Sequence, residues 1–134
     1  MTPSLSRLYP AGRALLGVLF LISGVLKIGG FAGTAAWMAS AGLPLASILL
    51  VLTIVIEIAG GLTLITGWNA RWGALGLAVF LVPVSLVFHG FWSADAATFQ
   101  NQLNHFLKNV SILGGMLVVY ALESQIRGGT AKAQ

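Results

Sequence analysis

Residues 43–67 read LPLASILLVLTIVIEIAGGLTLITG and contain a single charged side chain, Glu57. At a rise of ~1.5 Å per residue, a helix over this stretch would be roughly 37 Å long, more than the ~30 Å hydrocarbon thickness of a bilayer. The stretch therefore predicts a membrane-spanning helix. Because an ionised carboxylate inside a membrane costs at least ~2.5 kcal/mol, we expect Glu57 to face other helices, to pair with a cation, or to stay protonated.

The composition of the whole chain agrees with this reading. Of its 134 residues, 57% are hydrophobic and only 7% are charged, whereas soluble domains carry about 25% charged residues. The chain contains no cysteine, which excludes thiolate catalysis and cysteine-ligated metal clusters. The net charge of +4 comes from scattered side chains, so we expect no nucleic-acid binding. No nucleophile, phosphate-loop or dinucleotide motif is present.

Three further apolar runs complete an all-α fold, which we predict to be an integral membrane four-helix bundle in one membrane domain over residues 1–134. The predicted transmembrane helices cover about residues 8–28, 44–67, 72–92 and 104–122. A short interfacial helix is expected between the first two, because residues 29–42 carry no charge and include Phe31, Trp37 and Met38. The first run is also short enough to resemble a signal peptide, but no cleavage pattern follows Lys27.

The distribution of cations predicts the orientation of the bundle. Five cations flank one side of the predicted spans, and two flank the other. The first group is Arg7, Arg13, Arg71, Arg127 and Lys132, and the second is Lys27 and Lys108. The positive-inside rule therefore places both termini in the cytoplasm. The four tryptophans then fall at the two membrane interfaces, where tryptophan is favoured.

One face of the first helix offers partners for the buried acid. Arg13, Gly17, Phe20, Gly24 and Lys27 follow one another at spacings of four, three, four and three residues. These spacings put them on one side of a helix, with glycines that allow a close neighbour. We expect this face to pack on Glu57, Gly60 and Gly61, with Arg13 as the ion-pair partner of Glu57. The pair would either fix the helix register or take part in handling a ligand or a proton.

A second polar set gathers where the predicted helices end on the opposite side of the membrane. Its members are Lys27, His89, Trp92, Asn104, His105, Lys108 and Asn109. They are candidates for a pocket that holds an anionic or quinone-like head group. The alternative is that helix ends are polar because water is near. No metal site is predicted, because His89 and His105 lack a third, acidic ligand nearby.

The order of these residues resembles the DoxX family of small four-helix membrane proteins. The resemblance rests on six blocks, which run from Arg13 to Gly115. They are Arg13-x3-Gly17-x2-Phe20-x3-Gly24-x2-Lys27, Phe31-Ala32-Gly33, Gly42-Leu43-Pro44, Glu57-x2-Gly60-Gly61-Leu62-x4-Gly67, His89-x2-Trp92, and Asn104-x-Phe106-x-Lys108-Asn109 with Gly114-Gly115.

The resemblance implies a multi-pass protein of the bacterial inner membrane that is associated with redox chemistry. The family's namesake is similar to a subunit of thiosulfate:quinone oxidoreductases, and other members look like membrane partners of soluble redox proteins. The candidate functional residues implied are Arg13, Lys27, Glu57, His89, Lys108 and Asn109.

Three functions follow as hypotheses. The first is a redox-associated membrane subunit or anchor that binds a quinone-type ligand between its helices beside a protein partner, without being catalytic alone. The second is a structural partner in the assembly of a membrane complex, and self-association is compatible with either. The third is a small transporter of protons or anions, which the lack of a broken helix disfavours.

Overall fold

The protein is entirely helical in a computed structural model. The structure describes the backbone of residues 3–132 and the side chains of residues 6–128. The elements are α1 (Pro3–Gly29), α2 (Phe31–Ser40), α3 (Ala46–Thr66), α4 (Ala70–Phe88), a 3-10 turn η1 (Phe91–Ser93) and α5 (Phe99–Lys132). Four of them, all but α2 and η1, are long and apolar enough to cross a membrane. The predicted four-helix bundle with a short helix after the first span is confirmed.

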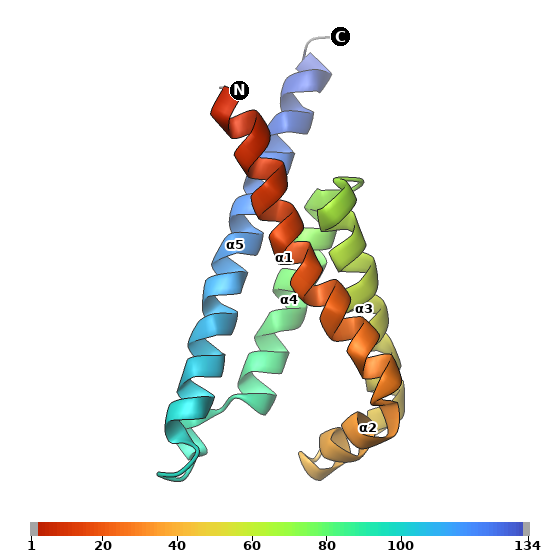
Figure 1. Cartoon of the computed structure of the whole chain (residues 1–134), viewed down its shortest axis with the longest axis vertical. Helices are drawn as coiled ribbons and strands as arrows, with labels where there is room; N and C mark the ends of the chain where they lie inside the picture. Colours follow the sequence, from red (N-terminus) through yellow and green to blue (C-terminus); the bar gives the residue numbers. More distant parts are fainter. Residues whose placement is uncertain (1–2, 133–134) are drawn as a thin grey trace.

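The four long helices alternate in direction and leave the bundle open at one end. Figure 1 shows α1 and α5 crossing near the end that holds both termini and diverging towards the other end. We call the first the terminal end, marked by Arg13, Gly67 and Glu123, and the second the loop end, formed by residues 30–45 and 89–98. α1 packs mainly on α3, and α5 mainly on α4. As a result, α1 and α5 make few contacts beyond their crossing.

The close packing of α1 on α3 depends on glycine. A Cβ placed on Gly61 would lie 2.7 Å from the carbonyl oxygen of Gly17, and one placed on Gly24 would lie 3.2 Å from the Cβ of Glu57. Glycines allow two backbones in a membrane to approach this closely, which increases the dispersion contacts along the pair. The predicted packing of the glycine face of the first helix on Glu57 and Gly61 is confirmed, but Gly60 faces Leu77 of α4 instead.

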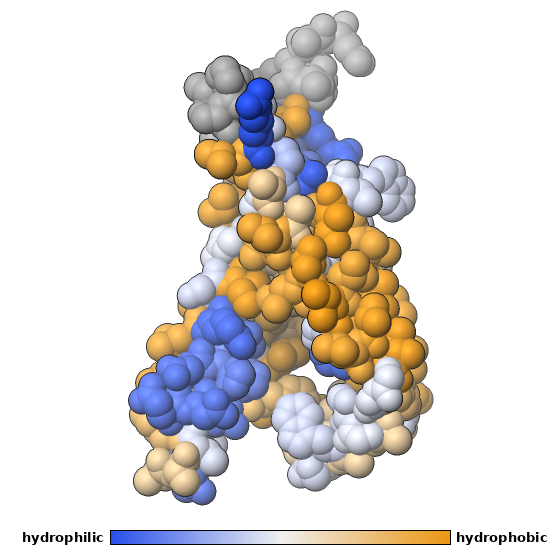
Figure 2. Space-filling view, viewed as in Figure 1, coloured by the Kyte–Doolittle hydropathy of each residue, from blue (hydrophilic) through white to orange (hydrophobic). Residues whose placement is uncertain are grey.

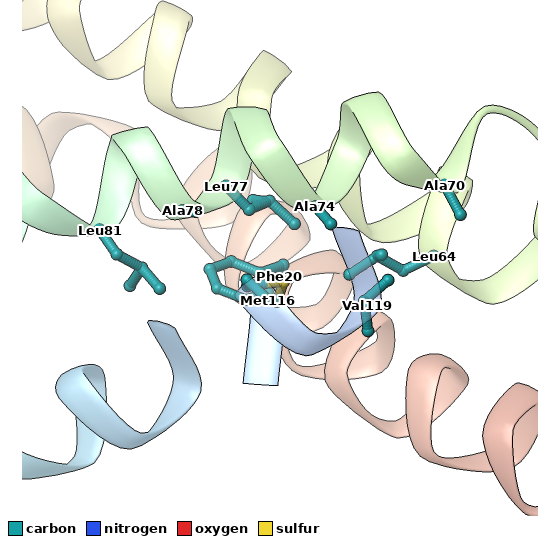
Figure 3. Packing of buried hydrophobic residues seen from close by; sticks show 9 residues of the cluster. All are labelled: Phe20, Leu64, Ala70, Ala74, Leu77, Ala78, Leu81, Met116 and Val119. Atoms are coloured by element: carbon teal, nitrogen blue, oxygen red, sulfur yellow. The ribbon is translucent and has the colours of Figure 1, made fainter. Parts of the chain in front are cut away.

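The buried core lies where all four long helices meet, towards the terminal end. It contains Phe20 of α1, Leu64 of α3, Ala70, Ala74, Leu77, Ala78 and Leu81 of α4, and Met116 and Val119 of α5. Figure 3 shows Phe20 and Met116 together at the centre of this cluster. The small alanines of α4 let its neighbours come close. The core therefore joins the helices at the terminal end.

Several helix boundaries differ from the prediction: α1 begins at Pro3, α4 ends at Phe88, and both ends of α5 are shifted. α5 begins at Phe99 rather than near Asn104, because Asp95 accepts hydrogen bonds from the backbone N–H and the hydroxyl of Thr98 and so organises the turn that starts the helix. α5 also continues to Lys132. The predicted end of this helix near Leu122 is wrong, and Glu123, just beyond it, is only 6% exposed within the bundle.

Candidate functional site

The buried acid of α3 pairs with Lys27 of α1. The ammonium of Lys27 donates to both carboxylate oxygens of Glu57, at 3.0 and 2.9 Å. It also donates to the hydroxyl of Ser23 at 2.6 Å, and that hydroxyl in turn donates to Glu57 at 3.2 Å. Glu57 is 5% exposed and lies near the middle of α3. The three side chains therefore form a hydrogen-bonded ion pair inside a membrane-spanning segment.

The predicted pairing of Arg13 with Glu57 is wrong, and the register of the two helices explains why. α1 and α3 run in opposite directions, and Gly24 lies level with Glu57. Arg13 is eleven residues before Gly24, which corresponds to roughly 16 Å along the helix axis. Its guanidinium lies instead beside Gly67, at the end of α3. Spacing along one helix face does not contain this offset between the two helices.

Arg13 forms a second ion pair at the terminal end. Its Nη1 donates to Oε1 of Glu123 on α5 at 2.7 Å, and the hydroxyl of Tyr9 donates to the same oxygen at 2.9 Å. Both charged side chains are largely buried, with 12% exposed for Arg13 and 8% for Glu123. The guanidinium also lies near the carboxyl end of α3, where the helix dipole favours a cation. This pair joins the first and last helices at their crossing.

The Lys27–Glu57 pair opens onto a cleft at the loop end. The cleft has a volume of about 220 Å³ and lies among α1, α3, α4 and α5. Its polar lining is Ser23, Lys27, Glu57, His89, Lys108 and Asn109, and apolar residues that include Phe20 and Leu81 form its inner wall. Figure 2 shows the molecule hollowed between the hydrophilic start of α5 and the lower end of α1 and α2. An ion pair inside the span is therefore accessible to a small molecule.

His89 and His105 meet at the edge of this cleft. Their rings are stacked with centroids 5.0 Å apart. Nδ1 of His89 lies 3.1 Å from Oε1 of Gln102, and in the tautomer that donates to this oxygen Nε2 is an acceptor. The ammonium of Lys108 donates to Nδ1 of His105 at 3.2 Å. Among the described residues, no group of three or more His, Asp or Glu side chains could hold a metal ion.

Three members of the predicted polar set do not line the cleft: His105 stacks on His89 at its edge, and Trp92 and Asn104 lie farther away. Trp92 is 57% exposed and makes edge contacts with the rings of Phe91 and Phe106. Asn104 accepts a hydrogen bond from Gln100 on the exposed side of α5. The structure therefore brings together Lys27, Glu57, His89, Lys108 and Asn109 at the cleft, while Arg13 lies at the other end of the bundle.

The sequence reading missed two residues that complete the ion pairs. Ser23 precedes Lys27 by one helical turn, so it shares the face that the spacing had already identified. Glu123 follows Met116 and Val119 at spacings of seven and four residues, which puts it on the buried face of α5. The hydrophobic periodicity therefore carried a signal for Glu123, but it was hidden by the assumption that the helix ends at Leu122.

The charges around the cleft do not balance. Its lining contains two ammonium groups, Lys27 and Lys108, but only one carboxylate, Glu57. Asp95 lies outside the spans, in the exposed turn before α5, where hydrogen bonds from the hydroxyl and backbone N–H of Thr98 lower the pKa of its carboxyl. With neutral histidines the cleft has one excess positive charge, which favours an anionic or electron-rich ligand.

Comparison with known proteins identifies the family. The family profile for DoxX matches residues 9–90, more than half of the chain. The chain is 34% identical over 107 residues to "Inner membrane protein YqjF" of Escherichia coli (strain K12), covering 80% of this chain and 77% of that protein. It is 27% identical over 107 residues to "Inner membrane protein YphA" of the same organism, covering 80% and 76%. No solved structure matches the chain significantly. This chain is therefore a multi-pass inner membrane protein that belongs to the DoxX family.

Proposed function

We propose that this DoxX family protein binds a quinone-type head group in the cleft at its loop end and acts as a redox-associated membrane subunit or anchor. The observation that carries the proposal is the Lys27–Glu57 ion pair, which lies inside the span and lines an open cavity. Polar and charged groups within a membrane are costly, and where they face a cavity they usually serve a ligand.

The hydrogen-bonding groups of the cleft suit both redox forms of such a ligand. A quinone presents two carbonyl oxygens, which accept hydrogen bonds from an ammonium such as that of Lys27 or Lys108. The reduced form presents two hydroxyls, which can donate to the carboxylate of Glu57 or to Nε2 of His89. The excess positive charge of the cleft also favours the electron-rich oxygens of either form.

The position of the cleft suggests where a protein partner would act. The cleft opens at the loop end, away from both termini. A redox partner that exchanges electrons with the ligand would dock there, because electron transfer requires proximity. With both termini in the cytoplasm, as the cations predict, this partner would lie on the outer face of the inner membrane.

The binding proposal is tested by titrating the purified protein with a tail-free benzoquinone and by mass spectrometry of quinones that co-purify from native membranes. Glu57→Gln and Lys27→Met should each weaken binding of the probe at least tenfold. The matched control is Glu123→Gln, which alters the other buried ion pair, outside the cleft. If the wild type binds no quinone and Glu57→Gln retains full biological function, the proposal fails and a structural role in complex assembly is favoured.

The orientation can be tested directly because the chain contains no cysteine. Ala97→Cys would place one thiol in the exposed turn before α5 at the loop end. A membrane-impermeant maleimide added to intact spheroplasts should label Ala97→Cys and should fail to label a cysteine added after Gln134. The opposite pattern would place the loop end, and with it the redox partner, in the cytoplasm.

A further inference from the structure

Three cavities at the loop end share their walls. The cleft at Lys27 and Glu57 adjoins a second cavity of about 170 Å³, and both are lined by these two residues and by His89. A third cavity, of about 290 Å³, lies among α2, α3 and α4 and shares Met38, Thr53 and Phe88 with the second. Phe80 and Val84 line all three. The three cavities therefore adjoin one another in the loop half of the bundle, and we call this row of cavities the passage.

The chemistry of the wall changes along this passage. The first cavity is lined by charged and polar groups. The second combines Lys27, Glu57 and His89 with aromatic side chains. In the third, Thr53 is the only lining residue with a polar side-chain group, and the other walls are apolar side chains such as Leu52 and Ile56 of α3 and Val87 of α4. The passage is thus polar at one end and apolar at the other.

The apolar end opens sideways, towards the lipid. Leu52 and Val87 are 53% and 46% exposed, and both lie on helices that are long and apolar enough to cross the membrane. The stacked rings of Trp37 and Phe88, with centroids 4.5 Å apart, join α2 to the end of α4 beside the second cavity. A molecule dissolved in the bilayer can therefore reach the apolar groove without leaving the membrane.

We propose that the ligand is a tailed amphiphile of the bilayer whose head group lies at Lys27 and Glu57 while its single hydrocarbon tail occupies the groove between Leu52 and Val87. This inference rests on the proposed function and assigns the tail's place and the ligand's route of entry. Each cavity alone is smaller than the ~300 Å³ at which pockets for drug-sized ligands begin. A ligand of that size must therefore extend through more than one of them.

The polarity of the first and third cavities determines which of them holds the head group and which holds the tail. A polar head group in the apolar groove would lose its hydrogen bonds to water without replacing them, which is unfavourable. A hydrocarbon tail in the first cavity would cover Lys27 and Glu57 and separate them from water. The reverse placement satisfies both parts of the molecule.

The test compares two probes on variants reconstituted in nanodiscs. The probes are a tail-free benzoquinone and the same ring with a decyl chain. Val87→Trp fills the groove from α4. Its matched control is Val79→Trp, since Val79 is also an exposed valine of α4, at 65%, and lines none of these three cavities. Leu19→Trp, at the mouth of the first cavity, tests the alternative exit for the tail.

We expect Val87→Trp to weaken binding of the decyl probe at least tenfold while leaving the tail-free probe unchanged, and Val79→Trp to change neither. Equal binding of the decyl probe by Val87→Trp and Val79→Trp would overturn the tail placement but leave the head-group site intact. Selective loss of the decyl probe in Leu19→Trp would overturn it too, because the tail would then leave through the first mouth. Failure of the wild type to bind either probe would overturn the proposed function as well.

Discussion

Two ion pairs among the described residues, Arg13–Glu123 and Lys27–Glu57, have similar chemistry and opposite surroundings. Each joins one basic residue of α1 to one carboxylate of a later helix, at 2.7 Å for Arg13–Glu123 and 2.9 Å for Lys27–Glu57. The first lies at the helix crossing beside the packed core, and its basic side chain is 12% exposed. The second lines an open cleft, and its basic side chain is 27% exposed.

The difference shows that burial of charge inside a membrane protein does not by itself indicate function. Breaking a buried ion pair is costly wherever it lies, because one charge is left without compensation. Only a pair that a ligand can reach is able to do more than join helices. The Arg13–Glu123 pair therefore serves as an internal reference for the Lys27–Glu57 pair, and the predictions below exploit that contrast.

The largest effect is expected from Gly61→Leu, which would separate α1 from α3. Both ion pairs depend on this helix contact, because it positions the basic residues of α1. The new Cβ alone would lie 2.7 Å from the carbonyl oxygen of Gly17 and 2.8 Å from the amide nitrogen of Leu21. Backbone atoms cannot move aside as a flexible side chain can, so the helices must part. We expect no monodisperse protein by size-exclusion chromatography in mild detergent.

Gly114→Leu is the matched control for this change. A Cβ at Gly114 meets nothing within 4 Å, and leucine favours the helix over glycine by up to about 1 kcal/mol. The variant should purify like the wild type with an equal or higher melting temperature. Equal damage from both variants would show that the α1–α3 contact is less important than the structure indicates.

The next largest effect is expected from Arg13→Met, which leaves Glu123 buried without its cation. Removing one partner of a buried pair costs about 3–5 kcal/mol. Glu57→Gln should cost less, about 1–3 kcal/mol, because the open cleft lets water reach Lys27. Thermal unfolding in detergent measures both changes. A larger loss for Glu57→Gln than for Arg13→Met would reverse the assignment of structural and ligand-facing roles.

Replacing both residues of an ion pair at once should distinguish the Arg13–Glu123 pair from the Lys27–Glu57 pair most clearly. Apolar residues of similar size often replace a buried ion pair without loss of stability. Arg13→Met with Glu123→Met should therefore recover most of the melting temperature and keep quinone binding. Lys27→Met with Glu57→Met should recover stability but not binding. Retained binding in the second double variant would remove the Lys27–Glu57 pair from the ligand site.

The smallest effect is expected at the turn before α5, which belongs to neither pair. Hydrogen bonds from the hydroxyl and backbone N–H of Thr98 lower the pKa of Asp95 in the folded protein. Its stabilising contribution is therefore present above the unfolded pKa of about 3.9 and is lost as the pH falls through the lower folded value. Asp95→Ala should slightly lower the melting temperature at pH 7, and the difference from wild type should vanish in strong acid.

The sequence predicted local features well and the pairing of distant ones poorly. Hydropathy identified the four spans and the short helix, because each depends on the residues of one segment. Glycine spacing identified the faces of α1 and α3 that meet, because each face is a property of a single helix. The partner of Glu57 depends on how two antiparallel helices are offset. That offset is set by the contact of Gly17 with Gly61 and of Gly24 with Glu57, which no single segment encodes.

The site itself shows the same limit. His89, Lys108 and Asn109 were identified as a polar set, and they line the cleft together with Lys27 and Glu57. Their meeting depends on how α1, α3, α4 and α5 are arranged around the cleft, where α1 and α5 diverge. Glu123 was missed because its helix continues beyond the apolar run, where hydropathy no longer indicates burial.

The chain order of the two ion pairs bears on how the protein is synthesised and inserted. Glu57 would cost at least ~2.5 kcal/mol in the membrane without a counter-ion, but Lys27 has already been made when α3 emerges. Arg13, in contrast, has no acid until Glu123 at the end of synthesis. We therefore expect α1 and α3 to enter the bilayer as a pair in which Lys27 compensates the charge of Glu57. α5 would pack against the other helices last. Chains truncated after Gly67 should then already insert both spans, and Lys27→Met should lower the inserted fraction of α3; equal insertion of α3 with and without Lys27 would contradict this order.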